Sequence, residues 1–291
     1  MIRRLVSRAH LRKLAAATLA VATACTAQRS ELPPVASPPT DQHRPGEFVW
    51  FDLLVDDPDA ARAFYGPLFG WTFEPLDDGS FDTIVNQGRP IGGLIRHTPH
   101  DDRTPDDVWL PSLSVADVDR SVANARAAGA DILRKPRDLG ERGRVAVLRD
   151  PGGAPFAVMR SAAGDPKAVA PSLGDFLWVQ LWVRDHEVAL PFYDRVAGWK
   201  VGEVVSHDGV EEGVFERDGV HVAGVIELPW KHVRANWLPY VRVADVAATI
   251  AAAKKSGGRV LVRGDHLAIL QDPQGAAIGV GLASADVEKD R

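Results

Sequence analysis

The chain has 291 residues, of which 45% are hydrophobic and 25% are charged, and its formal net charge is -5. This balance indicates a soluble globular protein, because a disordered chain lacks the apolar surface needed to offset the entropy lost on folding. The length suits one large domain or two small ones. The negative charge argues against nucleic acid as a partner, since that requires a basic surface. The single cysteine, Cys25, excludes an internal disulfide and a cysteine-rich zinc site.

The N-terminal segment has the form of an export signal. Five basic residues and no acid precede an apolar run of 11 residues, Leu14 to Ala24, which is too short for a membrane-spanning helix of about 20 residues. Cys25 follows directly, so the segment resembles a bacterial lipoprotein signal, in which the cysteine becomes the first mature residue and carries the lipid. We therefore expect a signal peptide over residues 1–24, lipidation at Cys25, and a membrane-anchored protein facing the periplasm or cell exterior. The alternative is an ordinary cleaved signal with an incidental cysteine.

Residues 25–45 read as a disordered tether that follows the lipidated cysteine. Five prolines and few large apolar side chains lie between Thr26 and Pro45. Such a composition favours an extended chain over a packed one. The folded part is expected to begin near Gly46.

An internal repeat organises the rest of the chain. An offset of 128 residues pairs Trp50 with Trp178, and it also pairs the dipeptides at 64–65 and 70–71 with those at 192–193 and 198–199. An echo of 60 residues lies inside each copy, so there are four related modules. Each begins with a period-2 apolar run, followed by a capping aspartate, a helical stretch and several short β-type runs. The pattern predicts an α+β fold of four βαβββ modules, with the first helix breaking near Gly66 because Pro67 follows.

Each copy also carries Phe-Tyr and Gly-Trp after its first helix and a late Asp-Pro-x-Gly, at Asp150–Gly153 and Asp272–Gly275. With these motifs, the chain from about Gly46 to Ala283 resembles the vicinal-oxygen-chelate superfamily, which includes glyoxalase I, bleomycin-resistance proteins and extradiol dioxygenases. The resemblance implies two glyoxalase-like domains, each a curved eight-stranded mixed sheet around a concave cavity. We place the domains at residues 46–160 and 174–283, the linker at 161–173 and a polar tail at 284–291.

Alternation along the opening strands separates two faces of each sheet. One set is apolar and is expected beneath the helices: Phe51, Leu53, Val55, Leu113, Val115, Val179, Leu181, Val183, Val241 and Val243. The other set is mixed and is expected to line the cavities. With two residues from later strands, Arg96 and Glu227, it gives the ligand-binding candidates Trp50, Asp52, Ser112, Ser114, Trp178, Gln180, Trp182, Tyr240 and Arg242. Aromatic walls with a few polar groups suit a small hydrophobic or aromatic ligand.

Metal binding is not expected. The superfamily's metal enzymes have His, Gln or Glu at the start of the opening strands and Glu on the last strand of each module. The resemblance places Trp50, Leu110, Trp178 and Leu238 at the first positions, and Arg96, Ala157, Glu227 and Gly279 at the second. Glu227 alone could bind a metal, whereas zinc or iron needs three or four protein ligands. We therefore expect neither metal nor cofactor.

Glu227 is the one catalytic candidate, as a base. It could form a structural pair with Arg242, or the two could bind a polar group of a ligand, and Asp52, Arg96 and Ser112 offer a looser set of the same kind. The preferred function is a metal-free, membrane-anchored protein that binds a small hydrophobic or aromatic molecule. A metal-dependent lyase, isomerase or dioxygenase is one alternative. A scaffold whose cavities are filled by their own side chains is another, and a homodimer stays open.

Overall fold

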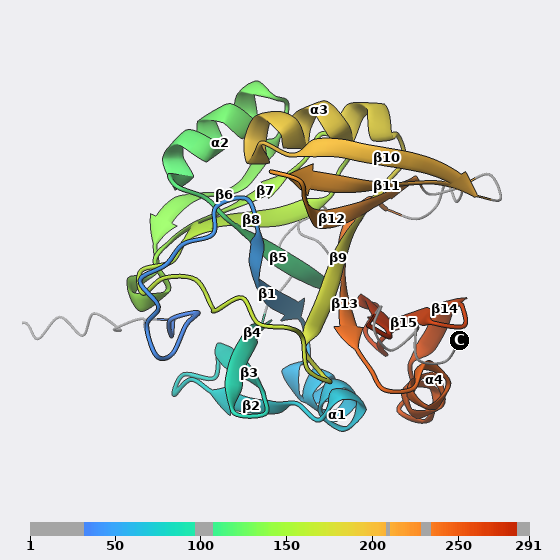
Figure 1. Ribbon diagram of the computed structural model, residues 1–291. Coiled ribbons are helices and arrows are strands. Elements are labelled where there is room, and N and C mark those ends of the chain that lie inside the picture. Colours follow the sequence, from blue (N-terminus) through green and yellow to red (C-terminus); the bar gives the residue numbers. More distant parts are fainter. Residues whose placement is uncertain (1–31, 97–106, 208–209, 228–233, 284–291) are drawn as a thin grey trace, which may run out of the picture.

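The computed structural model describes residues 32–96, 107–207, 210–227 and 234–283. These residues form two mixed eight-stranded sheets (Figure 1). The first has the order β2 (Thr72–Pro75), β3 (Phe81–Asn86), β4 (Arg89–Arg96), β1 (Phe48–Val55), β5 (Val108–Ser114), β8 (Pro155–Arg160), β7 (Arg144–Arg149), β6 (Asp131–Asp138). The second repeats it as β10 (Lys200–His207), β11 (Val210–Arg217), β12 (Val220–Glu227), β9 (Phe176–Val183), β13 (Asn236–Arg242), β16 (Ala277–Gly281), β15 (Leu267–Gln271), β14 (Arg259–Arg263). The predicted α+β fold of four βαβββ modules is confirmed.

Four helices follow the opening strands, and an aspartate caps each of them: α1 (Pro58–Phe69), α2 (Val118–Ala127), α3 (His186–Ala197) and α4 (Val246–Lys255). Each capping carboxylate accepts backbone N–H groups that have no partner inside the helix. The predicted break near Gly66 is wrong, since α1 continues through Pro67. Proline removes one hydrogen bond in the last turns, and Gly70, at φ 74°, closes the helix by donating its N–H to the Gly66 carbonyl.

The two sheets share one hydrophobic core. The whole apolar set predicted from strand alternation lies in it, together with side chains from both sheets and all four helices. Helices of different domains pack together, α2 against α3 and α1 against α4 (Figure 1). The domains therefore form one structure rather than two independent units.

The repeated Phe-Tyr and Gly-Trp motifs build the joint between the domains. The Tyr65 hydroxyl donates to Asp272 Oδ2 (3.0 Å), and the Tyr193 hydroxyl donates to Asp150 Oδ2 (2.9 Å). The two indoles also form hydrogen bonds to the opposite domain: Trp71 Nε1 donates to the Gly174 carbonyl (2.7 Å) and Trp199 Nε1 donates to the Gly46 carbonyl (2.8 Å). Each copy of the repeat thus reaches into the other in a reciprocal arrangement.

The described part of the segment before Gly46 is packed, which differs from the expected disordered tether. Val35 and Ala36 are 1% and 5% exposed. Farther along, the Thr40 N–H donates to the Ala163 carbonyl (2.9 Å), and the Asp165 N–H donates to the Gln42 carbonyl (2.7 Å). Residues 32–45 are therefore held against the first domain and the start of the linker. Cys25 and the proposed signal peptide lie outside the described residues.

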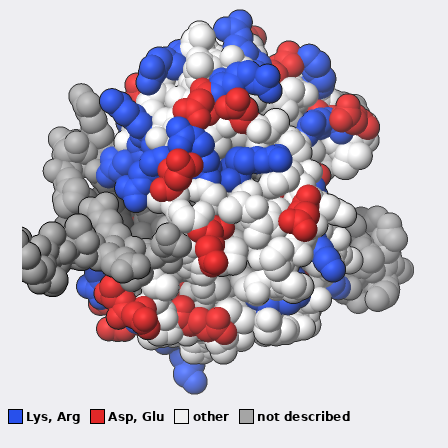
Figure 2. Space-filling view, turned by 90° about the vertical axis from the view of Figure 1, so that its left-hand side faces the viewer, with Lys and Arg blue, Asp and Glu red and all other residues white. Residues whose placement is uncertain are grey.

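The side of the molecule that carries β6 is strongly charged. Lys and Arg side chains gather there in a band with Asp and Glu beside them (Figure 2). Arg144 of β7 is paired with Asp119 (2.6 Å) and Asp138 (3.0 Å). Among the described residues, no helix has both the length and the apolar character needed to cross a bilayer.

Candidate functional site

The concave face of the first domain is filled by an arginine that sequence reasoning did not select. The Arg142 guanidinium lies over the rings of Trp50 (4.6 Å) and Phe81 (5.0 Å), and its side chain is only 3% exposed. Trp50 Nε1 donates to Asp52 Oδ1 (2.8 Å), which lies 3.7 Å from Arg142 Nη1. Burial raises the pKa of Asp52, although Arg142 and the Trp50 hydrogen bond act in the opposite direction.

The expected set of Asp52, Arg96 and Ser112 does not assemble. Asp52 faces Arg142 instead, and Arg96 is exposed at the end of β4, beside Val55. Ser112 is buried, at 2% exposed. The Ser114 hydroxyl donates to Asp165 Oδ2 (2.7 Å). Ser114 therefore fastens the linker to β5 and has a structural role.

The concave face of the second domain is packed by its own side chains. Gln180 Oε1 accepts hydrogen bonds from the Tyr240 hydroxyl (2.8 Å) and Trp182 Nε1 (3.2 Å). Trp182 and Tyr240 form a buried cluster with Leu238 and Ile269. Burial is also the main cause that raises the pKa of Tyr240, with the charge of Glu212 adding to it. Three predicted ligand-binding residues thus bind one another.

Glu227 and Arg242 do not form the expected pair. Their strands run on either side of β9, with Glu227 beside Val183 at one end and Arg242 near the other. Glu227 Oε2 lies 2.6 Å from His186 Nδ1, at the start of α3, and Arg242 Nη1 donates to the Pro171 carbonyl (2.6 Å). Glu227 therefore joins β12 to a helix N-terminus, where a carboxylate is electrostatically favoured.

The strand register corrects the last-strand positions assigned from the sequence. Asp52, Ser112, Gln180 and Tyr240 are related by the repeat, and they pair with Gly93, Ala157, Gly224 and Gly279. The equivalent positions are thus Gly93 and Gly224, and not Arg96 and Glu227, which lie three residues farther along. The assignment from the sequence failed in these two modules because the sequence does not fix which residue of the last strand lies opposite Asp52 or Gln180.

These positions do not fit a metal. A Cβ atom at Gly93 would lie 2.2 Å from Asp52 Oδ1, and one at Gly279 would lie 2.3 Å from the Tyr240 ring. The space for a ligating side chain is therefore already taken by residues of the concave faces. Within the described ranges, no group of three or more His, Cys, Asp or Glu side chains is arranged to hold a metal ion.

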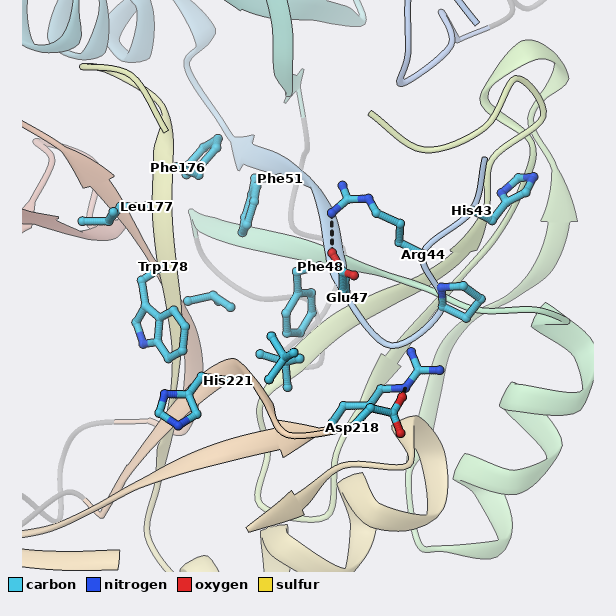
Figure 3. A pocket seen from close by; sticks show the side chains of 15 residues that line it. His43, Arg44, Glu47, Phe48, Phe51, Phe176, Leu177, Trp178, Asp218 and His221 are labelled. Atoms are coloured by element: carbon cyan, nitrogen blue, oxygen red, sulfur yellow. Dashed lines mark hydrogen bonds and ion pairs between the residues drawn. The ribbon is translucent and has the colours of Figure 1, made fainter. Parts of the chain in front are cut away.

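A pocket of about 600 Å³ lies between the domains, where β1 and β9 begin (Figure 3). Phe48, Phe51, Phe176, Leu177 and Trp178 supply its apolar wall. Its polar rim contains an ion pair between Arg44 and Glu47, a second between Arg217 and Asp218 (3.8 Å), and the rings of His43 and His221. The pocket thus combines aromatic surface with charges of both signs.

Two β-bulges place the phenylalanines in this pocket. The register shifts between Phe48 and Trp50 in β1, and again opposite Phe176 and Trp178 in β9. Strict alternation therefore fails at the start of both strands, and Phe51 stacks on Phe176 at 4.1 Å across the domain boundary. Of the residues predicted from the sequence to bind ligand, Trp178 alone lines this pocket. The repeat pairs Phe48 with Phe176, and this pairing was the sequence feature that could have identified both as pocket residues.

Comparison with known proteins agrees with this architecture. Residues 48–159 match the glyoxalase-like domain, and residues 175–280 match the glyoxalase/bleomycin resistance protein/dioxygenase superfamily. The anthracycline biosynthesis protein DauV of Streptomyces sp. strain C5 is 32% identical over 257 residues, covering 81% of this chain and 93% of that protein. CFP32 of Mycobacterium tuberculosis, whose name describes it as a glyoxylase, is 27% identical over 253 residues, covering 84% and 97%.

Two solved structures share the fold. The Mn(II)-bound glyoxalase from Novosphingobium aromaticivorans has a TM-score of 0.57 at 19% identity, covering 82% of this chain and 83% of that one. A variant of homoprotocatechuate 2,3-dioxygenase from B. fuscum has a TM-score of 0.58 at 16% identity, covering 87% and 74%. With two family domains in tandem and the paired eight-stranded sheets, the chain belongs to the glyoxalase/bleomycin resistance protein/dioxygenase superfamily, also called the vicinal-oxygen-chelate superfamily.

Proposed function

We propose that the protein binds a small aromatic molecule in the pocket between its domains, and that it does so without a metal. The observation that carries this proposal is the aromatic wall formed by Phe48, Phe51, Phe176 and Trp178. The pocket volume of about 600 Å³ lies within the range of roughly 300 to 1,000 Å³ that is usual for small-molecule sites. The names of two relatives that refer to anthracycline biosynthesis are consistent with an aromatic ligand.

The rim favours a ligand with an acidic or strongly polar substituent. Arg44 and Arg217 belong to the polar rim, and each is paired with a carboxylate. The rings of His43 and His221 add nitrogen atoms that can form hydrogen bonds. A flat ring can stack on Trp178 while a polar substituent at its edge leaves water and interacts with these charged and ring groups instead. His221 Nε2 lies 3.3 Å from Glu216 Oε1, and His43 Nδ1 lies 3.8 Å from Asp165 Oδ1, so a carboxylate lies beside each ring. The site therefore positions and desolvates a ligand.

Fluorescence titration tests this function with anthraquinone-2-sulfonate, a flat aromatic anion. Six of the tryptophans in the described part of the chain are at most 5% exposed, whereas Trp178 is partly exposed. Among these described tryptophans, saturable quenching should therefore report mainly on Trp178. In calorimetric titrations, which do not need Trp178 as the reporter, Trp178→Ala should weaken binding about tenfold through loss of ring stacking, and Trp178→Phe should retain most of it. Leu261→Ala, at an exposed residue of β14, is the control and should bind normally.

Two results would contradict the proposal. Absence of saturable quenching, or equal affinities in Trp178→Ala and the unaltered protein, would remove the pocket as the site. Stoichiometric zinc, manganese, iron or nickel in the purified protein would instead favour a metal-dependent lyase, isomerase or dioxygenase. Elemental analysis of the sample used for titration separates these outcomes.

We also propose that Cys25 carries a lipid that holds the protein on a membrane facing the periplasm or cell exterior. Support comes from the basic segment and the apolar run directly before this cysteine. More than one acyl chain would be needed for stable anchoring, since each buried methylene contributes about 0.8 kcal/mol. The protein from a bacterial host should incorporate labelled fatty acid and sediment with membranes, and Cys25→Ala should lose both properties. Labelling that persists in Cys25→Ala would overturn this assignment.

A further inference from the structure

Arg142 is buried with most of its hydrogen-bonding capacity unused. Nε donates to the Pro33 carbonyl (2.8 Å), Nη1 lies 3.7 Å from Asp52, and Nη2 has no hydrogen-bond partner among the described residues. The side chain is 3% exposed, so bulk water does not satisfy these donors. A buried guanidinium is costly unless its donors are paired. The arrangement therefore indicates a missing oxygen partner beside Nη2.

Other arginines of this chain show which partner suits that edge. Arg62 donates from Nε and Nη2 to the two oxygens of Asp82 (2.5 and 2.9 Å). Arg144 does the same with Asp119 (2.6 and 2.9 Å). At Arg142 the same edge meets one neutral carbonyl, which fills half of the fork. A carboxylate in place of the Pro33 carbonyl would complete it and supply the opposite charge.

The electrostatics of the concave face around Arg142, Trp50 and Asp52, which we call the chamber, also favour an added anion. Asp52 is the acidic side chain next to Arg142, but it lies beyond hydrogen-bonding distance and accepts a hydrogen bond from Trp50. Burial raises the pKa of Asp52, which weakens it as a counter-ion. The guanidinium charge is therefore only partly compensated, despite its position over Trp50 and Phe81.

The N-terminal segment also fills an apolar recess next to this arginine. Val35 is 1% exposed and packs in a cluster with Val49, Trp50 and Met159, with Val145 at its edge. Pro33 and Val35 thus present a carbonyl oxygen and a branched apolar group to the chamber. A small carboxylate with a branched alkyl end carries the same two features, with a better partner for the arginine.

We propose that the concave chamber of the first domain is a second binding site, for small branched-chain carboxylates, and that residues 33–37 occupy it as an exchangeable internal ligand. The segment stays attached through Thr40 and Gln42, whose backbone bonds to Ala163 and Asp165 lie outside the chamber. Ligand and segment therefore compete for Arg142. The site is separate from the pocket between the domains, so either can fail without the other.

NMR titration of the full chain with 4-methylpentanoate tests the competition, with the Trp50 indole N–H as reporter. Val35→Ser weakens the packing of residues 33–37 in the chamber, because it removes apolar surface that Val35 buries. It should therefore tighten carboxylate binding by about tenfold or more. Val169→Ser, at a residue 55% exposed in the linker, is the matched control and should leave the affinity unchanged. Hydrogen exchange of the Val35, Ala36 and Ser37 amides should accelerate when the carboxylate binds.

The neutral 4-methylpentanamide tests the charge requirement without any variant and should bind at least tenfold more weakly. Arg142→Lys keeps the charge but loses the fork and should lower the affinity similarly, whereas Arg144→Lys should not. No saturable shift in Val35→Ser would overturn the proposal and leave a buried water as the partner of Nη2. Equal binding of acid and amide would show that Arg142 does not select a carboxylate. Unchanged exchange of the Val35, Ala36 and Ser37 amides would show that the segment is no competitor.

Discussion

Tyr193→Phe tests the joint between the two domains most directly. The Tyr193 hydroxyl donates to Asp150 Oδ2 of the first domain and accepts from Trp237 Nε1 (2.8 Å) of the second. Removing the oxygen deletes one bond to a buried carboxyl group and leaves the indole N–H, in a fully buried side chain, without an acceptor. Bonds to charged groups contribute about 1.5 to 3 kcal/mol, and a buried unpaired donor costs about 1 to 3 kcal/mol. We expect Tyr193→Phe to lower the free energy of unfolding by about 2 to 5 kcal/mol.

The other two tyrosines supply a graded comparison. Tyr65 occupies the repeat-related place, but Trp109 Nε1 reaches its hydroxyl at 3.3 Å rather than 2.8 Å, so Tyr65→Phe should cost less than Tyr193→Phe. The Tyr240 hydroxyl bonds to the neutral Gln180 within one domain. Tyr240→Phe should therefore cost only about 0.5 to 1.5 kcal/mol.

Urea unfolding, followed by tryptophan fluorescence and far-ultraviolet circular dichroism, measures these changes. Because the core is shared, both probes should report one transition, which each substitution moves as a whole. Two separated transitions, with Tyr193→Phe affecting only one, would refute a common core. A loss below about 0.5 kcal/mol for Tyr193→Phe would refute the energetic role of the hydroxyl.

Three further outcomes are expected. Burial raises the pKa of Asp272 above its usual 3.8, so the folded state holds this proton more tightly than the unfolded state does. The difference in free energy of unfolding between the unaltered protein and Asp272→Asn should therefore shrink as pH rises from 3.8. Urea titrations in which this difference widens with pH would contradict the reasoning. Gly279→Ala should lower the stability measured in thermal unfolding by about 1 to 3 kcal/mol, because it forces a methyl group into the Tyr240 ring. Dialysis against a chelator should leave the melting temperature and anthraquinone-2-sulfonate binding unchanged, and loss of either would reveal a required metal.

Local patterns were sufficient for the modules. The capping aspartates and the period-2 runs predict helices and strands because both depend on neighbours within a few residues. The side-chain alternation also placed Leu53 and the other residues of the apolar set correctly in the shared core. Alternation failed at Phe48 and Phe176, because a bulge adds a residue without a local sequence signature that identifies it.

The partners of the candidate residues were harder to predict, since they come from distant parts of the chain. Asp52 faces Arg142 of the short helix Gly140–Arg142, which no strand period covers. Glu227 meets His186 instead of Arg242, because pairing with β9 places the two candidates at opposite ends of neighbouring strands. The alternation of polar residues along a strand therefore predicted which face they lie on, but it did not predict which residues they contact.

The amino-acid sequence alone determined the fourfold repeat, the α+β fold and the residues of the core, since repetition and periodicity are properties of the linear chain. Tertiary structure decided where a ligand has room. The concave faces are occupied by Arg142, Tyr240 and the segment around Val35, while the pocket opens between the domains. Close packing explains the difference: whether a cavity is open depends on the summed volumes of side chains that meet only after folding.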